Sequence, residues 1–373
     1  MMNTKTSINE PIRILHMIGS FEVGGSQALV INLYKAIYRS KIQFDFIVDH
    51  PERMELATVV QELGARIFFM PTFVGGNILQ VKKAWNTFFK EHPEYKILHS
   101  HVRSYASIYL PIAKKYGLKT IIHSHSTSNG TGVSAIVKKC LQIPLRYQAD
   151  YLFSCSAEAG EWLFGKKACS KKNYVFLPNA IKISDYQFSE ETAKKYRKEL
   201  GLDGKFVVGH VGRFHEAKNH LFLLDVFAEV CKHRSDAMLL LVGDGELRTA
   251  TADKVKELGL TERVIFTGNR KDVPQLLQTM DVFVFPSVWE GLPVTVIEAQ
   301  AAGLPCIISD SITQEVDVSD LVKRLSISNI EKWVNVILKT KNMHLDVSSQ
   351  IIQAGFEAKS VVAFLEAFYC LLF

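Results

Sequence analysis

The chain has 373 residues, of which 47% are hydrophobic and 22% are charged. This composition excludes a largely disordered protein, and the length suits two domains of ordinary size. The formal net charge is +6 at pH 7, and residues 1–180 hold 22 Lys and Arg against 12 Asp and Glu. A basic first half predicts an anionic partner, either nucleic acid or the inner membrane surface. No nucleic-acid-binding motif accompanies the charge, so we predict no nucleic-acid partner.

The apolar segments predict no membrane span. Residues 1–11 are polar and lack the plan of a secretory signal, and the apolar run at 360–373 is too short to cross a bilayer. Six cysteines are scattered without C-x-x-C spacing, which favours reduced thiols over a zinc site. We therefore expect a cytoplasmic protein. The cysteines are at positions 140, 155, 169, 231, 306 and 370.

Short apolar runs alternate with helix-like segments along the first half of the chain. Such alternation indicates a parallel sheet with helices on both faces. The predicted strands are 12–18, 44–48, 65–70, 96–99, 120–122 and 151–154, and the predicted helices include 26–38, 84–90 and 106–115.

The alternation stops near Leu177-Pro178-Asn179, and a polar, charged stretch follows at 182–205. It then resumes with predicted strands 206–211, 238–242, 264–267, 282–285 and 305–308. The sequence therefore predicts an α/β protein with two doubly wound, Rossmann-like domains. We expect an N-terminal domain at 1–180, a C-terminal domain at 181–355 and a terminal helix within 356–373.

Glu290 and Glu298 bracket the segment Gly291-Leu292-Pro293 and the start of a predicted helix that reaches Ala302. Pro293 suits the first helical position. A helix N-terminus offers unpaired N–H groups to a diphosphate, and a carboxylate on either side can accept hydrogen bonds from sugar hydroxyls. Two glutamates separated by seven residues are common by chance. The value of this motif as evidence for a ligand site therefore depends on the other segments around it.

Two further segments suit an anionic ligand. Gly24-Gly25 follows the first strand and precedes a helix, where a tight turn is the plainer explanation. Arg213 lies at the C-terminal end of the strand 206–211, and Lys218 lies near the start of the next helix. Both cations are therefore expected at the ligand-binding edge of the sheet. An ordinary solvated pair is the alternative. Gly243-Asp244-Gly245 lacks the third glycine of a dinucleotide fingerprint.

Two histidine pairs end predicted strands of the first half: His99-Ser100-His101 and His123-Ser124-His125. Strand alternation puts both histidines of a pair on one face. Metal binding is one possibility, and hydrogen bonding to a ligand or to the core is as plausible. The chain has no Asp-x-Asp and no H-E-x-x-H, so we predict that catalysis needs no metal.

Together these segments predict a cleft for a nucleotide diphosphate sugar, and over nearly its whole length the chain resembles a retaining glycosyltransferase of the GT-B fold, family 4. Within that family it is most similar to exopolysaccharide and biofilm-matrix glycosyltransferases of Gram-positive bacteria. Ser26-Gln27 and Asn179-Ala180 depart from the family's common Ala-Glu and Asn-Gly. The resemblance rests on Gly24-Gly25, His123-Ser124-His125-Ser126-Thr127, Leu177-Pro178-Asn179, Gly212-Arg213, Lys218, Gly243-Asp244-Gly245, Glu290 and Glu298.

The resemblance implies roles for several of these residues and for some of their neighbours. Arg213 and Lys218 would hold the diphosphate, Glu298 the ribose and Glu290 the transferred sugar. Backbone amides of Gly291 and Leu292 would assist. Gly268, Asn269 and Arg270 would meet the base, and Gly24 and Gly25 would close over the phosphates. A histidine would contact the sugar: His125 is preferred because His-Ser-Thr matches the family pattern, and His123 is second. The first domain would be the acceptor side and the second would bind the nucleotide-sugar donor. The terminal helix would cross back to the first domain.

The implied reaction is transfer of a sugar, with retention, from a nucleotide sugar such as a UDP-sugar to a lipid-linked glycan at the inner membrane face. It needs no cofactor, since the nucleotide sugar is a substrate. The residues leave open whether retention proceeds on one face or through a carboxylate nucleophile. A sugar-nucleotide epimerase of the same architecture and a catalytically silent partner subunit are the alternatives. Glu290, Glu298, Arg213 and Lys218 favour the transferase.

Overall fold

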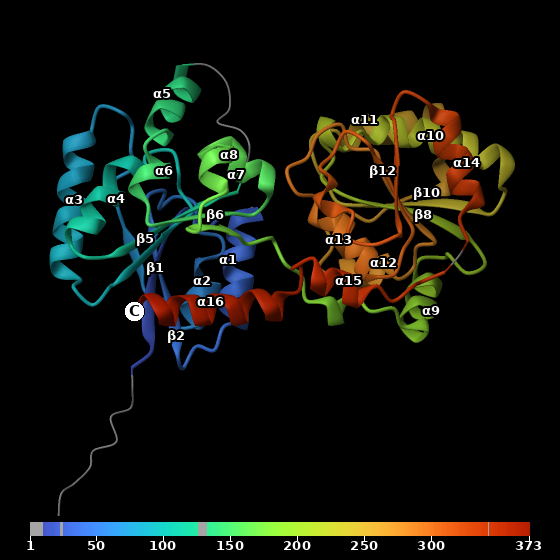
Figure 1. Ribbon diagram of the computed structural model, residues 1–373. Coiled ribbons are helices and arrows are strands. Elements are labelled where there is room, and N and C mark those ends of the chain that lie inside the picture. The colour runs from blue at the N-terminus through green and yellow to red at the C-terminus, as the bar shows by residue number, and fades with distance from the viewer. Residues whose placement is uncertain (1–9, 23–24, 126–132, 342) are drawn as a thin grey trace, which may run out of the picture. The chain divides into compact units, whose positions relative to one another are not determined.

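The structure is a computed structural model that describes residues 10–22, 25–125, 133–341 and 343–373 (Figure 1). The chain forms two compact units. The first consists of Met1–Asn179 with Ala358–Phe373, and the second of Ala180–Glu357. The C-terminal helix therefore belongs to the first unit, while the charged stretch after Asn179 belongs to the second.

The first unit contains a seven-stranded parallel sheet in the order β3-β2-β1-β4-β5-β6-β7. The order reverses between β1 and β4, which is where open α/β sheets bind ligands. The strands are β1 (Ile12–Gly19), β2 (Ile42–Val48), β3 (Ile67–Phe69), β4 (Ile97–Ser100), β5 (Lys119–Ser124), β6 (Tyr151–Ser154) and β7 (Tyr174–Phe176). The helices are α1 (Gly25–Ala36), α2 (Ala57–Glu62), α3 (Ile78–Glu91), α4 (Ala106–Lys115), α5 (Val133–Gln142), α6 (Leu145–Gln148), α7 (Ala157–Phe164), α8 (Lys166–Cys169) and α16 (Ala358–Leu372).

The two faces of this sheet have different partners. Leu15 and Met17 of β1 pack in one cluster with Trp85 of α3 and Tyr109 of α4. The intervening His16 points to the other face, where its ring lies 4.1 Å from Phe44 and 6.4 Å from Tyr369 of α16. α16 contacts α1 on that face. Strand alternation therefore collects the β1, β4 and β5 histidines on the face covered by α16.

The second unit contains a six-stranded parallel sheet in the order β10-β9-β8-β11-β12-β13, with its switch point between β8 and β11. The strands are β8 (Phe206–Val211), β9 (Ala237–Val242), β10 (Val264–Phe266), β11 (Val282–Phe285), β12 (Cys306–Ser309) and β13 (Val322–Leu325). The α-helices are α9 (Glu190–Glu199), α10 (His220–His233), α11 (Arg248–Glu257), α12 (Val273–Leu277), α13 (Val294–Ala301), α14 (Ile330–Lys339) and α15 (Ser348–Gln353). The 3-10 turns are η1 (Ile183–Asp185), η2 (Glu216–Lys218), η3 (Thr261–Arg263) and η4 (Gln314–Val316).

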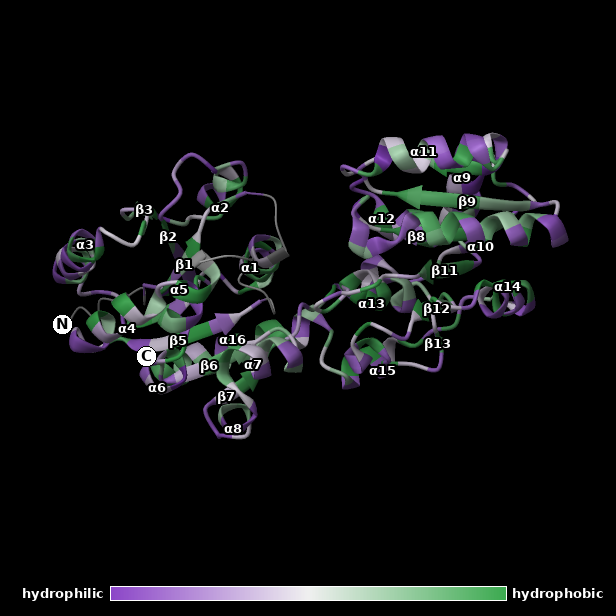
Figure 2. Ribbon diagram, turned by 90° about the horizontal axis from the view of Figure 1, so that it is seen from above, coloured by the Kyte–Doolittle hydropathy of each residue, from purple (hydrophilic) through white to green (hydrophobic). Residues whose placement is uncertain are grey.

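Apolar clusters cover both faces of this second sheet. One joins strand residues to Val296 and Ile297 of α13, and the other joins them to Leu223 of α10 and Trp333 of α14. Figure 2 shows β9 as an apolar strand with helices of mixed polarity beside it. Strands buried on both faces read as continuous apolar runs, which is why this sheet was predictable.

Some details differ from the sequence prediction. β7 and β13 were missed, and the charged stretch at 182–205 contains η1 and α9. α1 begins at Gly25, and α13 begins at Val294, so Pro293 lies just before that helix instead of at its first position. Within the described residues, no helix combines the length and apolar character that a bilayer crossing requires.

Candidate active site

Lys218 and Glu290, predicted as parts of one site, are brought together by the sheet order of the second unit. Lys218 ends η2 after β8, and Glu290 follows β11, the neighbouring strand. Lys218 Nζ lies 2.6 Å from Glu290 Oε1, and the two side chains are only 17% and 15% exposed. The ammonium also lies 4.7 Å from the centre of the Phe285 ring. The pair is therefore held in a largely desolvated position at the switch point.

Arg213 lies two residues after the end of β8, and its side chain is far more exposed than those of Lys218 and Glu290. Its guanidinium lies 3.2 Å from Glu246, and its side chain is 71% exposed. An exposed ion pair of this kind contributes little, so the guanidinium can exchange Glu246 for a phosphate at small cost. Arg213 lines a cavity of about 590 Å³. The polar and glycine residues around that cavity are Gly212, Arg213, Gly243, Asp244, Gly245, Asn269 and Arg270.

Two glycines bring the loop after β9 against the loop after β8. A Cβ at Gly243, where φ is +134°, would lie 2.2 Å from the Gly212 carbonyl oxygen. A Cβ at Gly245 would lie 2.6 Å from the Phe214 carbonyl oxygen. The Gly243 N–H also donates to Gly268 at 2.9 Å. These close approaches explain why positions 243 and 245 of the Gly243-Asp244-Gly245 sequence are glycines. No role in the site had been predicted for this sequence.

Asn269 and Arg270, predicted to meet the base, both line this cavity. Gly268 precedes them in the left-handed region at φ +68°, which favours glycine. The Arg270 guanidinium makes two hydrogen bonds to Asp272, at 2.7 and 2.6 Å. Asp272 thereby positions Arg270. Asn269 is exposed and lines the cavity.

Glu298 lies one turn inside α13, as the spacing predicted. Burial raises the pKa of its carboxyl, and a hydrogen bond from the Tyr186 hydroxyl acts in the opposite direction. Tyr186, which follows η1, was not identified from the sequence. Gly291 is exposed, and Leu292 packs against the apolar cluster beneath α13. Their proposed backbone contacts to a ligand stay predictions.

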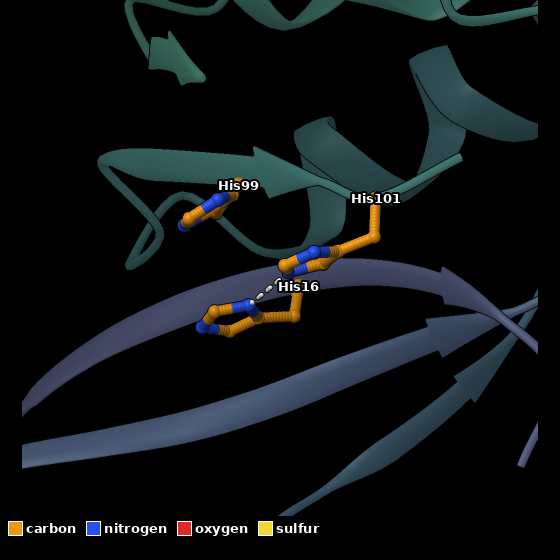
Figure 3. Close-up of side chains that lie close together, drawn as sticks. All are labelled: His16, His99 and His101. Atoms are coloured by element: carbon orange, nitrogen blue, oxygen red, sulfur yellow. Dashed lines mark hydrogen bonds between the residues drawn. The ribbon is translucent and has the colours of Figure 1, made fainter. Parts of the chain in front are cut away.

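Five histidines of the first unit form two hydrogen-bonded series. In the first, His16 Nδ1 lies 3.1 Å from His101 Nε2, and His101 Nδ1 lies 2.8 Å from His125 Nε2. Figure 3 shows the first of these links, with the His16 and His101 rings nearly parallel. Burial lowers the pKa of all three, to about 3 for His16 and His125, and the nearby charge of Arg103 contributes at His125. These imidazoles are therefore neutral at pH 7.

The second series joins His123 to the C-terminal helix. The Tyr369 hydroxyl lies 2.7 Å from His99 Nδ1, and His99 Nε2 lies 3.3 Å from His123 Nδ1. If Tyr369 donates, His99 donates from Nε2 to His123, and His123 carries its proton on Nε2. That nitrogen is buried and has no hydrogen-bond partner among the described residues. Nδ1 of His125 is in the same situation. Which ring contacts a sugar stays a prediction.

The same rings could hold a transition-metal ion. One ring nitrogen from each of His16, His99 and His101 lies within 4.8 Å of the others, and so does one from each of His101, His123 and His125. Neutral imidazoles are good ligands for such ions. The ring contacts described above are hydrogen bonds, in which each pair of nitrogens shares one proton. Metal-independent catalysis therefore stays a prediction that needs a direct test.

Four residues of the predicted motifs contribute less here. Gly24 lies outside the described residues, as do Ser126 and Thr127 of the His-Ser-Thr pattern. Gly25 is the first residue of α1. The predicted closure of these glycines over phosphates stays a prediction.

Each of the two Rossmann-like units contains a parallel sheet, and cations and carboxylates follow β8 and β11 of the second unit. These features are the ones expected of a glycosyltransferase of the GT-B fold. The family described as Glycosyl transferases group 1 matches residues 205–340. EpsF of Bacillus subtilis (strain 168), whose name places it among the glycosyltransferases, is 33% identical over 364 residues and matches 95% of each chain. The chain belongs to this glycosyltransferase family. The predicted fold class and enzyme class are thus confirmed.

Two further comparisons extend this result. The UDP-Gal:alpha-D-GlcNAc-diphosphoundecaprenol alpha-1,3-galactosyltransferase of Escherichia coli is 26% identical over 321 residues, covering 82% of this chain and 81% of its own. The crystal structure of Anabaena Alr3699/HepE in complex with UDP has a TM-score of 0.78 at 18% identity, covering 96% of this chain and 99% of that one. The second likeness concerns the fold alone.

Proposed function

We propose that the protein is a retaining, metal-independent glycosyltransferase that moves a sugar from a UDP-sugar to a lipid-linked glycan in exopolysaccharide or capsule synthesis. The carrying observation is the largely desolvated Lys218–Glu290 pair. A Cβ at Gly212 would lie 3.2 Å from Lys218 Cδ, and Gly212 and Arg213 both line the cavity of about 590 Å³. The names of the Escherichia coli relative and of the Anabaena complex, which mention a lipid diphosphate acceptor and UDP, support the choice of substrates.

The residues suit the chemistry of a departing diphosphate. On the one-face route, the acceptor hydroxyl forms a bond to the anomeric carbon on the same face from which the diphosphate oxygen departs, so the configuration is retained. The bonding electron pair leaves with the diphosphate, and the hydroxyl proton passes to it. Arg213 and Lys218 meet the growing negative charge, which is the usual way a site lowers such a barrier. Glu290, already held by Lys218, is suited to bind sugar hydroxyls.

Glu298 and the cavity supply the nucleotide side of the proposal. A carboxylate next to the Tyr186 hydroxyl can accept hydrogen bonds from both ribose hydroxyls. Asn269 offers an amide donor and acceptor for the base. A panel of nucleotide sugars, scored by thermal shift and by hydrolysis, tests this assignment. We expect UDP and a UDP-sugar to stabilise the protein, and loss of that shift in Glu298→Ala. Equal shifts with Glu298→Ala would contradict the ribose role.

We further propose peripheral binding at an anionic membrane. α5 and the residues after it expose Ile136, Val137, Ile143 and Tyr147 close to Lys138 and Lys139. An apolar surface flanked by cations suits a helix lying at a lipid surface. Flotation with anionic vesicles should recover the protein at low salt and lose it at high salt, because each surface cation contributes about 1 kcal/mol that salt screens. The double variant Lys138→Glu/Lys139→Glu should not float. Binding that ignores salt and both charges would refute this proposal.

A further inference from the structure

Three histidines of the first unit converge where two neighbouring parallel strands end. His123 lies in β5, while His101 directly follows β4 and His125 directly follows β5. The ring centres of His123 and His125 are 4.0 Å apart, and that of His101 lies 5.3 and 5.1 Å from them. One ring nitrogen from each residue lies within 4.8 Å of the others. The three rings therefore form a compact set of possible ligands.

The spacing of these rings is close to that of a metal site. Neutral imidazoles suit late divalent transition ions such as Zn²⁺, and burial keeps all three rings neutral at pH 7 by lowering the pKa of each. Zinc–nitrogen bonds of about 2.0–2.1 Å place the nitrogens of a tetrahedral site about 3.3 Å apart. His101 Nδ1 and His125 Nε2 are 2.8 Å apart. These two rings therefore need to separate by only about 0.5 Å to hold an ion.

Two of the three rings have an outer hydrogen-bond partner. His101 Nε2 lies 3.1 Å from His16 Nδ1, which is the contact drawn in Figure 3. His123 Nδ1 lies 3.3 Å from His99 Nε2. Metal-binding histidines usually hold the ion with one ring nitrogen and make such a contact with the other, which fixes the orientation of the ring. With both contacts kept, His101 can bind through Nδ1 and His123 through Nε2. The second of these nitrogens is buried and has no partner among the described residues, a costly state that a bound ion relieves.

The surroundings of the rings indicate a reversible site. His101 and His125 are only partly buried, so an ion can reach them from solvent. Three protein nitrogens leave a fourth position for water, as in open zinc sites. Burial and, after it, the charge of Arg103 lower the pKa of His125. The same charge repels a metal ion. We therefore expect weaker binding than at a structural site with four protein ligands, and removal of the ion by a chelator.

We propose that His101, His123 and His125 bind a late divalent transition-metal ion, with Zn²⁺ as the probe, and that the bound ion inhibits sugar transfer. The inhibition rests on the proposed glycosyltransferase function, in which His125 or His123 contacts the transferred sugar. A ring nitrogen bound to the ion is no longer available to the sugar. The ion is therefore an inhibitor of a reaction that itself needs no metal.

Ion binding also fixes the proton positions between this site and the C-terminal helix. With Nε2 bound to the ion, His123 carries its proton on Nδ1 and donates it to His99 Nε2. His99 then carries its proton on Nδ1 and donates it to the Tyr369 hydroxyl, 2.7 Å away. This order is the reverse of the one in which Tyr369 donates. The ¹⁵N NMR signals of His99 therefore report the bound ion through a residue that does not touch it.

Titration of full-length protein with Zn²⁺ tests the site without requiring turnover. Competition with a chromogenic chelator gives the Kd, and Co²⁺ in place of Zn²⁺ gives visible absorption bands that report nitrogen coordination. Loss of an outer partner alone costs metal affinity about ten- to a hundredfold, so we expect His123→Gln and His125→Gln to raise the Kd by more than about a hundredfold. His233→Gln, at the exposed end of α10, is the matched control and should bind like the parent protein. Mg²⁺, which prefers oxygen ligands, should not compete.

Three results would overturn the site. The first is no zinc binding, or equal Kd values in the parent and in His123→Gln and His125→Gln variants of unchanged melting temperature. The second, which needs no variant, is a His99 proton on Nε2 in the zinc-saturated parent. The third is loss of binding in His16→Gln but not in His123→Gln, because the ion would then lie in the other histidine group, His16, His99 and His101.

Turnover separates the inhibition from the binding. Zinc should lower the transfer rate of the parent, and a chelator should restore it. His101→Gln should lose this sensitivity, measured relative to its own zinc-free rate. Unchanged transfer by the zinc-saturated parent, or a transfer rate that zinc raises, overturns the inhibition. No transfer by the zinc-free parent overturns the proposed function instead, and leaves the binding result standing.

Discussion

The Lys218–Glu290 pair makes a prediction in which stability and activity respond differently. Lys218→Met removes the ammonium but keeps an apolar side chain over Phe285. It leaves the largely buried Glu290 carboxylate without its cation, 2.6 Å away in the parent. An unsatisfied buried polar group costs about 1–3 kcal/mol of unfolding free energy, and a charged group costs more. The same change removes one of two cations assigned to the diphosphate.

The expected loss of activity follows from the same chemistry. A charge-assisted hydrogen bond contributes about 1.5–3 kcal/mol, so kcat/KM for the donor should fall about ten- to a hundredfold. Adding Glu290→Gln should restore most of the stability, because the unpaired charge is gone. It should not restore activity, because Glu290 itself is assigned to the transferred sugar.

Chemical denaturation and initial-rate kinetics with a UDP-sugar measure the two effects. Lys232→Met is the control, since Lys232 pairs with Glu229 on the exposed surface of α10 at 2.6 Å. It should leave both quantities nearly unchanged. A Lys218→Met enzyme within twofold of the parent in kcat/KM would refute the assignment of Lys218. Recovery of activity in the double variant would refute the separate role of Glu290.

Three further predictions concern metal, the C-terminal helix and pH. Excess chelator should leave turnover unchanged; abolition with rescue by Mg²⁺ or Mn²⁺ would show a required metal. Tyr369→Phe removes the hydroxyl that contacts His99 and should lower the unfolding free energy by about 1 kcal/mol. It should also change the tautomers of His99 and His123 that ¹⁵N NMR reports. Unchanged tautomers would contradict the order in which Tyr369 donates to His99 and His99 donates to His123. Burial disfavours ionisation of Asp150, but hydrogen bonds from Lys114 and Thr120 outweigh it and lower the pKa of its carboxyl. A carboxyl group whose pKa is lower in the folded than in the unfolded protein stabilises the fold at pH values above its unfolded pKa, and this stabilisation is lost as pH falls through the folded pKa. Asp150→Asn should therefore lower the unfolding free energy by about 1 kcal/mol at pH 7 and by less near pH 3. An equal loss at both pH values would contradict this prediction.

The sheets were predictable because their strands are buried on both faces. The bounds 151–154, 206–211 and 282–285 agree with β6, β8 and β11. β13 was missed because it lies at the sheet edge and has two consecutive cations, Lys323 and Arg324, between its two apolar residues. Edge strands of this kind give a weak apolar signal.

α9 shows a signal that the sequence did carry. Its apolar content is low, so a search for apolar periodicity overlooks it. However, the Ser189 side chain accepts from the Thr192 N–H, Glu190 and Glu191 occupy the first turn, and Arg197 and Lys198 the last. Capping and charge placement of this pattern identify a helix without an apolar stripe.

From the sequence, residues of the site were predictable only where they follow the end of a predicted strand. Arg213, Lys218 and Glu290 follow strands whose carboxyl ends meet, so the edge rule located them. Tyr369 and His99 are 270 residues apart, and no local pattern joins them.

Transfer itself tests the central claim most directly. Purified protein is incubated with a UDP-sugar identified by the thermal-shift panel and with a synthetic N-acetylglucosaminyl diphosphate lipid as acceptor. Mass spectrometry then detects the extended lipid, and NMR reports the configuration of the new linkage. The account predicts a product one sugar longer, with the anomeric configuration of the donor, and its loss in Arg213→Ala. No extended product with any nucleotide sugar of the panel, or a product of inverted configuration, would contradict it.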